Sequence, residues 1–387
     1  MIETSPISNN SKSRRKLTIL SVGDVMLGGR VGNKIEGQGL AYPFKCVEKK
    51  LKEGDIVFGN LEIPFDGHNR EPFLYDTHPD FKADPLYAPS LKTGCFHILS
   101  LANNHIMDWG KDVALETIEL VNSLGIKTIG AGVNLNEAAK PVVIEKNGTK
   151  LGFLAYVHQG RYCATMRRAG ANPLMPRRIY RDLAELRPKV DLLIVSLHFG
   201  LMFTDIPSPY QRQLCHSIIE GGADLILGHH PHVIQGVEKY KHGLIAYSLG
   251  EFVADQAGGK AKHYRHDAGE KRKETMILRV TFRRSGDLNY EMIPCRIENF
   301  QPRILTGDES ERLKEKMVHL SALLGQKKHF WEHAGEAVAE DIFRVLAFEL
   351  STSGLRAVFS RLKRIRFRHF LILLGYLKRR ISRKRER

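Results

Sequence analysis

Short apolar runs alternate with amphipathic segments along most of the chain. The runs that predict buried strands lie at residues 17–22, 56–60, 98–102, 192–197 and 225–228. The segments with apolar residues at helical spacing, which predict helices, lie at residues 44–52, 111–124 and 209–220. The last of these helices has Pro209 at its start, where proline is tolerated. This alternation of strands and helices predicts an α/β fold.

Two hairpins are predicted from turn residues between extended segments. Asn147 and Gly148 separate residues 142–145 from residues 150–157, and a Ser-Gly-Asp turn separates residues 275–282 from residues 288–293. The sheet is expected to end near residue 300, and no internal repeat of fixed period is present.

Residues that bind metals stand at the ends of five apolar runs. They are Asp24, Glu62, Asn104 beside His105, His198, and the pair His230 and His232. Parallel α/β sheets bind ligands at the carboxyl ends of their strands, so these side chains are expected to converge. The set offers nitrogen and oxygen ligands and no thiolate, which suits Mn, Fe or Zn. Two such ions with a shared carboxylate favour phosphoester hydrolysis.

The motifs around these residues, in this order, resemble those of the CapA family of capsule or poly-gamma-glutamate biosynthesis proteins, within the calcineurin-like metallophosphatase superfamily. They are GD at 23–24, GNLE at 59–62, ANNHIMDWG at 102–110, HFG at 198–200, GHHPHVIQG at 228–236 and YSLGEF at 247–252. The resemblance spans about residues 17–255. It implies a metallophosphatase-like two-layer β-sandwich flanked by helices, with two metal ions at one sheet edge.

The resemblance also implies a role for each site residue. Asp24 and His232 would hold one ion, and Glu62 would bridge both. The ligands of the other ion would be Asn104, His198 and His230. His105 takes the place of the catalytic imidazole, which protonates the leaving oxygen or steadies the phosphoryl group, and Asp108 would orient its ring.

Two positions depart from the family pattern. Met26 stands where superfamily members carry a histidine ligand, so water or another group must replace that ligand. Glu251 stands where the CapA pattern shows asparagine, which adds a negative charge that alters substrate choice or supplies an extra ligand.

The other polar residues of these motifs have simpler interpretations. As an alternative to a role in the metal site, Asn103 and Asn104 would cap the helix that begins near Lys111. His229 is predicted to lie behind the ligands or to face solvent. The loop histidines are predicted to be surface residues: His68, His78, His158, His263 and His266. Of these, His158 and His266 are candidate substrate contacts.

Cysteine usage and the N-terminal residues predict a cytoplasmic protein. The five cysteines among 387 residues are dispersed and form no C-x-x-C pair, which is typical of reduced thiols. Residues 1–10 are polar, and a basic triplet at 14–16 leads directly into the first apolar run, so no signal segment is expected.

The net charge of +16 is concentrated at the C-terminus. Residues 361–387 hold twelve Lys or Arg against the single Glu386, a net charge of +11. Apolar residues such as Phe367, Phe370 and Leu374 interleave with these cations, which predicts an amphipathic helix on the anionic inner face of a membrane. A packed helix with a frayed end is the alternative. Nucleic-acid binding is not expected, because no stacking platform or recognition motif is present.

Two internal segments are also basic. Residues 160–188 contain seven arginines, which either clamp an anionic substrate or form a solvated loop and helix face. Residues 256–272 are rich in Gly, Lys and His and are expected to form a loop near the site.

The predicted organisation is a disordered segment at 1–16, a CapA-like domain at 17–300 and a helical C-terminal extension at 301–387. The predicted function is that of a dimetal hydrolase acting on an anionic small molecule or polymer. Two alternatives remain open: a peptide-modifying enzyme in which His105 abstracts a proton beside a metal-polarised carbonyl, and a non-catalytic assembly factor of a membrane polymer machine.

Overall fold

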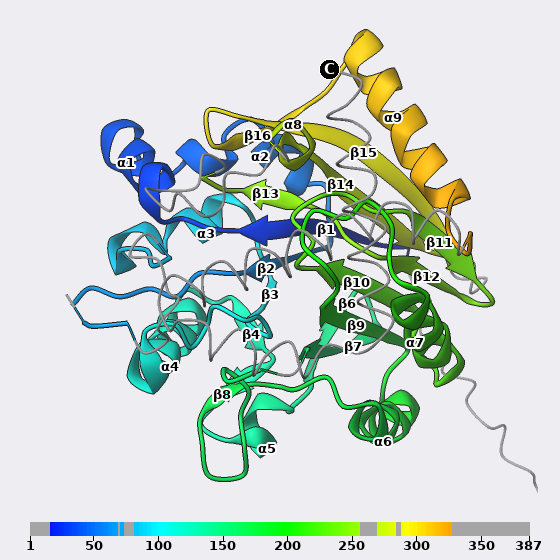
Figure 1. The fold of residues 1–387 in the computed structure, drawn as a ribbon, viewed down its shortest axis with the longest axis horizontal. Helices are drawn as coiled ribbons and strands as arrows, with labels where there is room; N and C mark the ends of the chain where they lie inside the picture. The colour runs from blue at the N-terminus through cyan, green and yellow to red at the C-terminus, as the bar shows by residue number, and fades with distance from the viewer. Residues whose placement is uncertain are drawn as a thin grey trace, which may run out of the picture.

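Two β-sheets packed face to face form the body of the protein, and helices cover their outer faces (Figure 1). The computed structural model describes residues 16–68, 70–72, 81–158, 160–255, 269–283 and 288–326. This arrangement is the predicted two-layer sandwich with flanking helices.

The larger sheet has eight strands in the order β16-β15-β14-β1-β2-β3-β4, and β13 pairs with the far end of β1. Strands β1 to β4 run parallel to one another, whereas β14, β15 and β16 form an antiparallel extension. The bounds are β1 Leu17–Val25, β2 Ile56–Leu61, β3 Ile98–Ser100, β4 Lys127–Ile129, β13 Glu251–Val253, β14 Glu274–Phe282, β15 Leu288–Glu298 and β16 Gln301–Ile304.

The smaller sheet has six strands in the order β11-β12-β10-β9-β7-β6. Its four central strands are parallel, and an antiparallel strand closes each edge. The bounds are β6 Val142–Lys146, β7 Thr149–Val157, β9 Leu192–His198, β10 Leu225–His229, β11 Val237–Tyr240 and β12 Gly243–Ala246. A separate two-stranded ladder joins β5 Ala131–Gly132 to β8 Gly170–Ala171.

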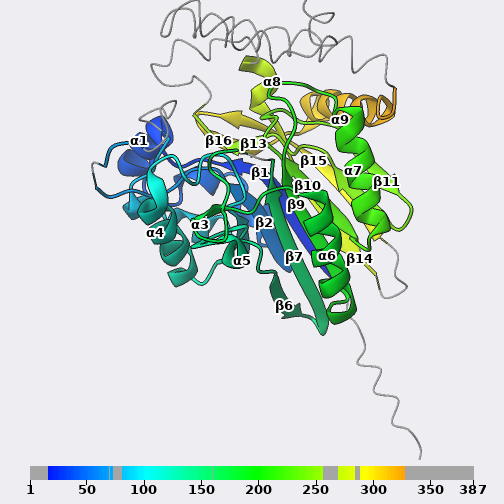
Figure 2. The same cartoon turned by 60° about the horizontal axis from the view of Figure 1, so that its bottom comes forward.

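Alternate residues of the smaller sheet feed two different cores. In β7, Leu151, Phe153 and Ala155 point into the core between the sheets, whereas Leu154 and Tyr156 point outward. The outward residues pack with apolar side chains of α6 Pro176–Leu186 and α7 Pro209–Glu220, which cover the outer face of this sheet (Figure 2). This two-sided burial explains why the central strands read as continuous apolar runs.

The remaining described helices surround the larger sheet and the open edges. Their bounds are α1 Gly29–Gln38, α2 Glu48–Leu51, α3 Ser90–Thr93, α4 Gly110–Ser123, α5 Leu135–Ala138, α8 Gly269–Lys273 and α9 Gly307–Ala322, with 3-10 turns at Tyr42–Phe44, Pro85–Tyr87 and Arg187–Lys189. The predicted helices at 111–124 and 209–220 are confirmed by α4 and α7, and both predicted hairpins form, as β6-β7 and β14-β15.

The single helix predicted over residues 44–52 is wrong. A 3-10 turn, Tyr42–Phe44, and one turn of α-helix, Glu48–Leu51, occupy this stretch instead. Phe44, Val47 and Leu51 are all fully buried. Two consecutive short turns therefore bury the same three positions as a continuous helix would, so the apolar spacing does not distinguish them.

The larger sheet continues past residue 300. Strand β16 pairs with β15, and α9 packs against β15 and β11. Within the described residues, no helix is both long and apolar enough to cross a membrane. The segment 1–15, most of the 256–272 loop and the basic tail at 361–387 lie outside the described residues.

Candidate metal centre

The carboxyl ends of the parallel strands from both sheets meet at one place. Asp24 lies near the end of β1, and Glu62 directly follows β2. His198 ends β9, and His230 and His232 follow β10. All five side chains are buried. The convergence follows from the topology, because parallel strands in facing sheets present their carboxyl ends at the same edge.

Two glycines allow the strands to approach closely enough to form this centre. A Cβ on Gly23 would lie 1.9 Å from the carbonyl oxygen of Gly250, and a Cβ on Gly228 would lie 1.9 Å from that of Tyr247. Both obstacles are backbone atoms, which cannot rotate away. Only glycine therefore fits at these two positions.

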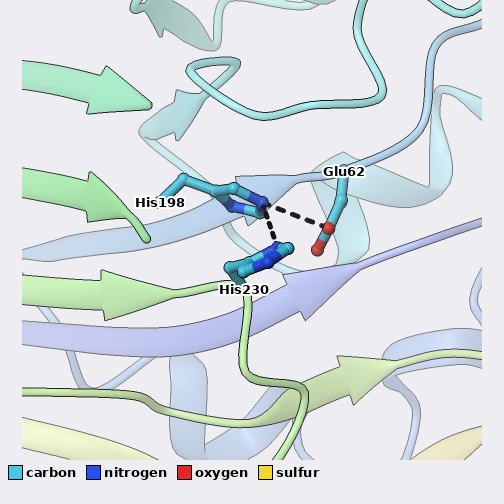
Figure 3. A group of neighbouring side chains, drawn as sticks. All are labelled: Glu62, His198 and His230. Carbon is cyan, nitrogen blue, oxygen red and sulfur yellow. Dashed lines mark hydrogen bonds and ion pairs between the residues drawn. The ribbon is translucent and has the colours of Figure 1, made fainter. Parts of the chain in front are cut away.

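The first donor group consists of Glu62, His198 and His230, whose side chains point toward one another (Figure 3). His198 Nε2 lies 3.4 Å from Glu62 Oε1 and 3.2 Å from His230 Nδ1. Asn104 Oδ1 lies 2.6 Å from the same Nε2 atom of His198. The structure thus brings together all the residues expected around one ion.

The second donor group consists of Asp24, Glu62 and His232. His232 Nδ1 lies 3.2 Å from Asp24 Oδ2, and His232 Nε2 lies 3.8 Å from Glu62 Oε1. Glu62 belongs to both groups, and its Oε1 atom is the one that faces the histidines of each. This is the position that a bridging carboxylate requires.

Several donor atoms lack hydrogen-bond partners, and their separations suit ligands of a divalent cation. Asp24 Oδ2, Glu62 Oε1 and His232 Nδ1 are buried and make no hydrogen bond, although buried polar atoms normally find partners. Ligands of a tetrahedral site with metal bonds of about 2.1 Å lie roughly 3.4 Å apart. The separations of 3.2 and 3.4 Å around His198 are close to that value.

The electrostatics of the centre also favour cation binding. Burial, together with the charge of Asp24, raises the pKa of Glu62 well above its usual value. Burial opposes ionisation of Asp24 too, but the close imidazoles of His229 and His232, whose Nδ1 atoms lie 3.3 and 3.2 Å from the Asp24 carboxylate oxygens, hold the pKa of Asp24 well below its usual value. Burial lowers the pKa of His198 and His230, which keeps both rings neutral and able to bind a metal.

The backbone at the β10 end is held in a sparsely populated conformation. His230 has φ +95° and His232 has φ +59°, in the left-handed region that non-glycine residues rarely adopt. Such strain persists only where the surroundings enforce it, and it clusters at functional sites. Here it turns two successive imidazoles, at 230 and 232, toward different donor groups.

Asn60 and Asn103 form a buried amide pair beneath the donors, and sequence reasoning missed this role for both. Asn60 Nδ2 donates to Asp24 Oδ1 at 2.8 Å, and Asn103 Nδ2 donates to Asn60 Oδ1 at 3.3 Å and to the Leu61 carbonyl at 2.7 Å. Asn103 Oδ1 accepts from the backbone amide of His105 at 3.1 Å. The pair thus links Asp24 to the loop that carries His105.

The alternative that Asn103 and Asn104 cap a helix is wrong. Helix α4 begins at Gly110 with Trp109 as its N-cap residue, and no side chain caps it. Asn103 bonds its own loop and Asn104 bonds His198, because both lie six or more residues before the helix begins.

His105 stands at the rim of the centre with its ring fixed from two sides. Its Nδ1 lies 2.8 Å from Asp108 Oδ2, and the Phe81 ring stacks on it at 4.4 Å between centroids. The opposite nitrogen, Nε2, lies 4.0 Å from Glu62 Oε1. The arrangement presents Nε2 toward the donors and uses Nδ1 for positioning, as an acid or base with a fixed tautomer requires.

The two departures from the family pattern have different surroundings, and only Glu251 contacts the second donor group. Met26 packs against the apolar core. Glu251 is fully buried, and its Oε1 lies 3.6 Å from His232 Nδ1 and 2.6 Å from Arg272 Nη2. The Arg272 guanidinium also lies 5.5 Å from the Phe203 ring centroid. The extra carboxylate at 251 is therefore matched by a cation beside the centre.

The structure decides between the two positions predicted for His229 and corrects the prediction for His158. His229 lies behind the ligands and does not face solvent: it is fully buried, with Nδ1 3.3 Å from Asp24 Oδ1. His158 is not a surface residue: it is half-buried, and its ring centroid lies 5.2 Å from that of His230. His68 is exposed as predicted, and the other three loop histidines lie outside the described residues: His78, His263 and His266.

The arginines of segment 160–188 divide between structural and exposed positions. Arg187 pairs with Asp224 at 2.6 Å and donates to three backbone carbonyls, so it holds the start of β9. Arg161, Arg167 and Arg177 are exposed. Neither interpretation of the segment therefore holds for all seven residues.

Comparison with known proteins gives consistent matches. The family model described as bacterial capsule synthesis protein PGA_cap matches residues 18–256. The capsule biosynthesis protein CapA of Bacillus anthracis is 30% identical over 305 residues, which cover 76% of this chain and 71% of that protein. The PGA biosynthesis protein CapA of Bacillus subtilis (strain 168) is 28% identical over 300 residues, which cover 77% of this chain and 75% of that protein. Among solved structures, the 5'-nucleotidase precursor of Thermus thermophilus is a distant match, with a TM-score of 0.43, 13% identity and coverage of 79% of this chain and 58% of that chain.

Proposed function

Because this chain belongs to the bacterial capsule synthesis protein (PGA_cap) family, we propose that it is a two-metal hydrolase that cleaves a phosphoester-type anionic substrate during the production of capsule or a poly-glutamate-like polymer. One observation carries the proposal: two buried donor groups share Glu62, and Asp24 Oδ2, Glu62 Oε1 and His232 Nδ1 among their atoms have no hydrogen-bond partner. A pair of ions bridged by a carboxylate is suited to in-line displacement at phosphorus.

The distances between the donor atoms support the ligand assignment that we propose. Glu62, Asn104, His198 and His230 would hold one ion, and Asp24, Glu62 and His232 the other. The donors are imidazole, carboxylate and amide groups, which suit Mn, Fe or Zn. Bound ions of this kind supply Lewis-acid stabilisation and make a coordinated water acidic enough to act as a nucleophile.

The residues of the chain perform the remaining steps. Asp108 would accept a hydrogen bond from Nδ1–H of His105 and orient the ring, so that Nε2 faces the reacting group and, when the ring is protonated, donates its proton to the leaving oxygen. Phe81 prevents the ring from rotating out of this plane. Burial of Glu62 and Asp24 excludes bulk water from beneath the reacting group, which strengthens the electrostatic interactions there.

The test uses the full chain loaded with manganese or zinc and an aryl phosphate as substrate. We expect turnover that falls about a hundredfold to ten-thousandfold in His105→Ala, with metal content unchanged. His68→Ala, which alters an exposed histidine away from the centre, is the matched control and should keep full turnover.

Two results would redirect the assignment. Solvent-deuterium incorporation into a peptide substrate, without phosphoester cleavage, would favour proton abstraction by His105. Full metal content without either activity would favour a non-catalytic role in polymer assembly.

We further propose that residues 361–387 bring the protein to an anionic membrane surface. The support is the sequence alone: these residues lie outside the described part of the chain, and they combine a net charge of +11 with interleaved apolar side chains.

A further inference from the structure

The second donor group has one side chain fewer than the first. Its members are Asp24, Glu62 and His232, whereas Asn104 completes a set of four donors around the first ion. Tetrahedral metal sites in proteins take four ligands. Met26 packs against the apolar core, and thioethers suit softer ions than manganese. The second group is therefore one donor short of four.

Strand β13 brings Glu251 to this group. The strand runs parallel to β1, and Glu251 lies opposite Asp24 in the register of the two strands (Figure 1). Residues opposite each other on neighbouring strands point to the same face of a sheet. The two carboxylates therefore lie on one face, and both residues are fully buried.

The Nδ1 atom of His232 is close to both carboxylates. It lies 3.2 Å from Asp24 Oδ2 and 3.6 Å from Glu251 Oε1. Among the described residues, neither His232 Nδ1 nor Asp24 Oδ2 has a hydrogen-bond partner. Ligands of a tetrahedral ion with bonds of about 2.1 Å lie roughly 3.4 Å apart. The two separations lie on either side of that value, so they suit three ligands of one ion.

Arg272 holds the Glu251 carboxylate. Its Nε and Nη2 atoms donate to Glu251 Oε1 at 3.1 and 2.6 Å, and its side chain is only 13% exposed. Carboxylates that bind metals commonly accept a hydrogen bond from a further residue, which fixes their orientation. The guanidinium also offsets one of three buried carboxylates, those of Asp24, Glu62 and Glu251, and bound cations would offset the others.

Anchoring of α8 does not by itself explain why Glu251 is buried at this place. Helix α8 has two further ion pairs, one between Lys271 Nζ and Asp205 Oδ2 at 2.5 Å and one between Glu270 and Arg296. Neither pair involves a residue of the donor groups. A carboxylate that only anchored the helix would not need to lie beside His232.

We propose that Glu251 is a ligand of the ion at the second donor group, in place of the histidine that Met26 replaces, and that Arg272 positions its carboxylate. The inference rests on the two-ion centre of the proposed function and is independent of the reaction. Three carboxylates and one imidazole form an oxygen-rich set, which suits manganese.

The experiment titrates the full chain with manganese and measures free Mn²⁺ by electron paramagnetic resonance. We expect the parent to bind two ions and Glu251→Gln to bind the second ion about a hundredfold more weakly or worse, because even residues behind the ligands contribute about tenfold to hundredfold. Glu270→Gln removes the same charge from an exposed position on α8 and should bind both ions as the parent does.

Arg272→Gln separates a ligand from an anchor. If Glu251 binds the ion, loss of its positioning partner should weaken the second ion by at most about tenfold, far less than Glu251→Gln does. In manganese-loaded crystals of the parent, a Glu251 oxygen should lie about 2.2 Å from the second ion. This measurement does not depend on the folding of any variant.

The outcomes separate this inference from the proposed function. Equal manganese binding by Glu251→Gln and the parent, or an equal loss in Glu251→Gln and Arg272→Gln, would overturn the ligand role. Crystals in which both ions are bound and Glu251 contacts Arg272 but neither ion would overturn it too. Two ions whose binding depends on Glu251, without phosphoester cleavage, would support the ligand role and count against the hydrolase.

Discussion

Asn60 should be a principal structural support of the candidate metal centre, and Asn60→Leu tests that role. The side chain is fully buried, and leucine has a similar size but no polar atoms. The substitution removes the 2.8 Å hydrogen bond to Asp24 Oδ1 and the acceptor that receives Asn103 Nδ2 at 3.3 Å. It also removes the amide group that lies 3.4 Å from His198 Nδ1.

The expected loss of stability follows from the groups left behind. A buried polar group that loses its partner costs about 1–3 kcal/mol. Asn103 keeps its hydrogen bond to the Leu61 carbonyl, and Asp24 Oδ1 keeps His229 nearby, so each group loses only one of its polar contacts. We therefore expect a total of about 2–4 kcal/mol in the metal-free protein, in the lower part of the range for two lost partners. Metal affinity should fall about tenfold to a hundredfold, because Asp24 is no longer held in place.

The assay is urea unfolding of metal-free protein, followed by metal titration of the folded variant. Asn122→Leu on α4 is the control, since Asn122 is exposed and its side chain, among the described residues, hydrogen-bonds to Thr128 alone; its effect should stay within about 0.5 kcal/mol. If Asn60→Leu unfolds at the same urea concentration as this control and binds metal with the parent's affinity, Asn60 does not position the carboxylate.

Three further predictions concern other parts of the molecule. Gly228→Ala should destabilise the protein by about 3 kcal/mol or more, because the added Cβ meets a backbone oxygen. Thermal unfolding compares this variant with Gly37→Ala, where nothing lies within 4 Å of the added Cβ, and equal melting temperatures would show that position 228 does not require glycine. Because the pKa of Glu62 is raised in the folded protein, the protonated carboxyl group stabilises the metal-free fold at low pH, and this stabilisation is lost as the pH rises through the folded-state pKa. The free energy of unfolding of the metal-free parent should therefore fall relative to that of Glu62→Gln between pH 5 and pH 8. Urea unfolding of both proteins at the two pH values checks this, and a difference that does not change with pH would refute the shift. Deletion of residues 361–387 should release the protein from anionic vesicles, because each Lys or Arg near the membrane surface contributes about 1 kcal/mol to binding, and metal content should stay the same. Equal sedimentation of the full-length and truncated proteins with the vesicles would exclude the membrane role of the tail.

The convergence of the donors was predictable because it depends on a simple rule of topology. Asp24, Glu62 and His198 end apolar runs, and parallel strands bring such ends together. The same rule applies to His158, which directly follows the apolar strand β7. The polar residues that come after His158 favoured its interpretation as a surface residue instead. Its proximity to His230 was therefore missed.

Other features of the centre leave no local signal in the sequence. Asn60 lies within an apolar strand, and its role arises only when β1, β2 and the loop after β3 are packed together. Glu251 and Arg272 are 21 residues apart, and most of the intervening chain lies outside the described residues. Contacts of this kind depend on tertiary geometry rather than on residue pattern.

The presence of two ions at the predicted positions is the most direct test of the account. Crystals of the full chain grown with manganese should give two anomalous-scattering peaks, one bound by Glu62, His198 and His230 and the other by Asp24, Glu62 and His232. Crystals of His230→Ala should lose the first peak. A map of the parent protein with no peak at either donor group, under conditions that saturate a control manganese enzyme, would contradict the two-metal centre.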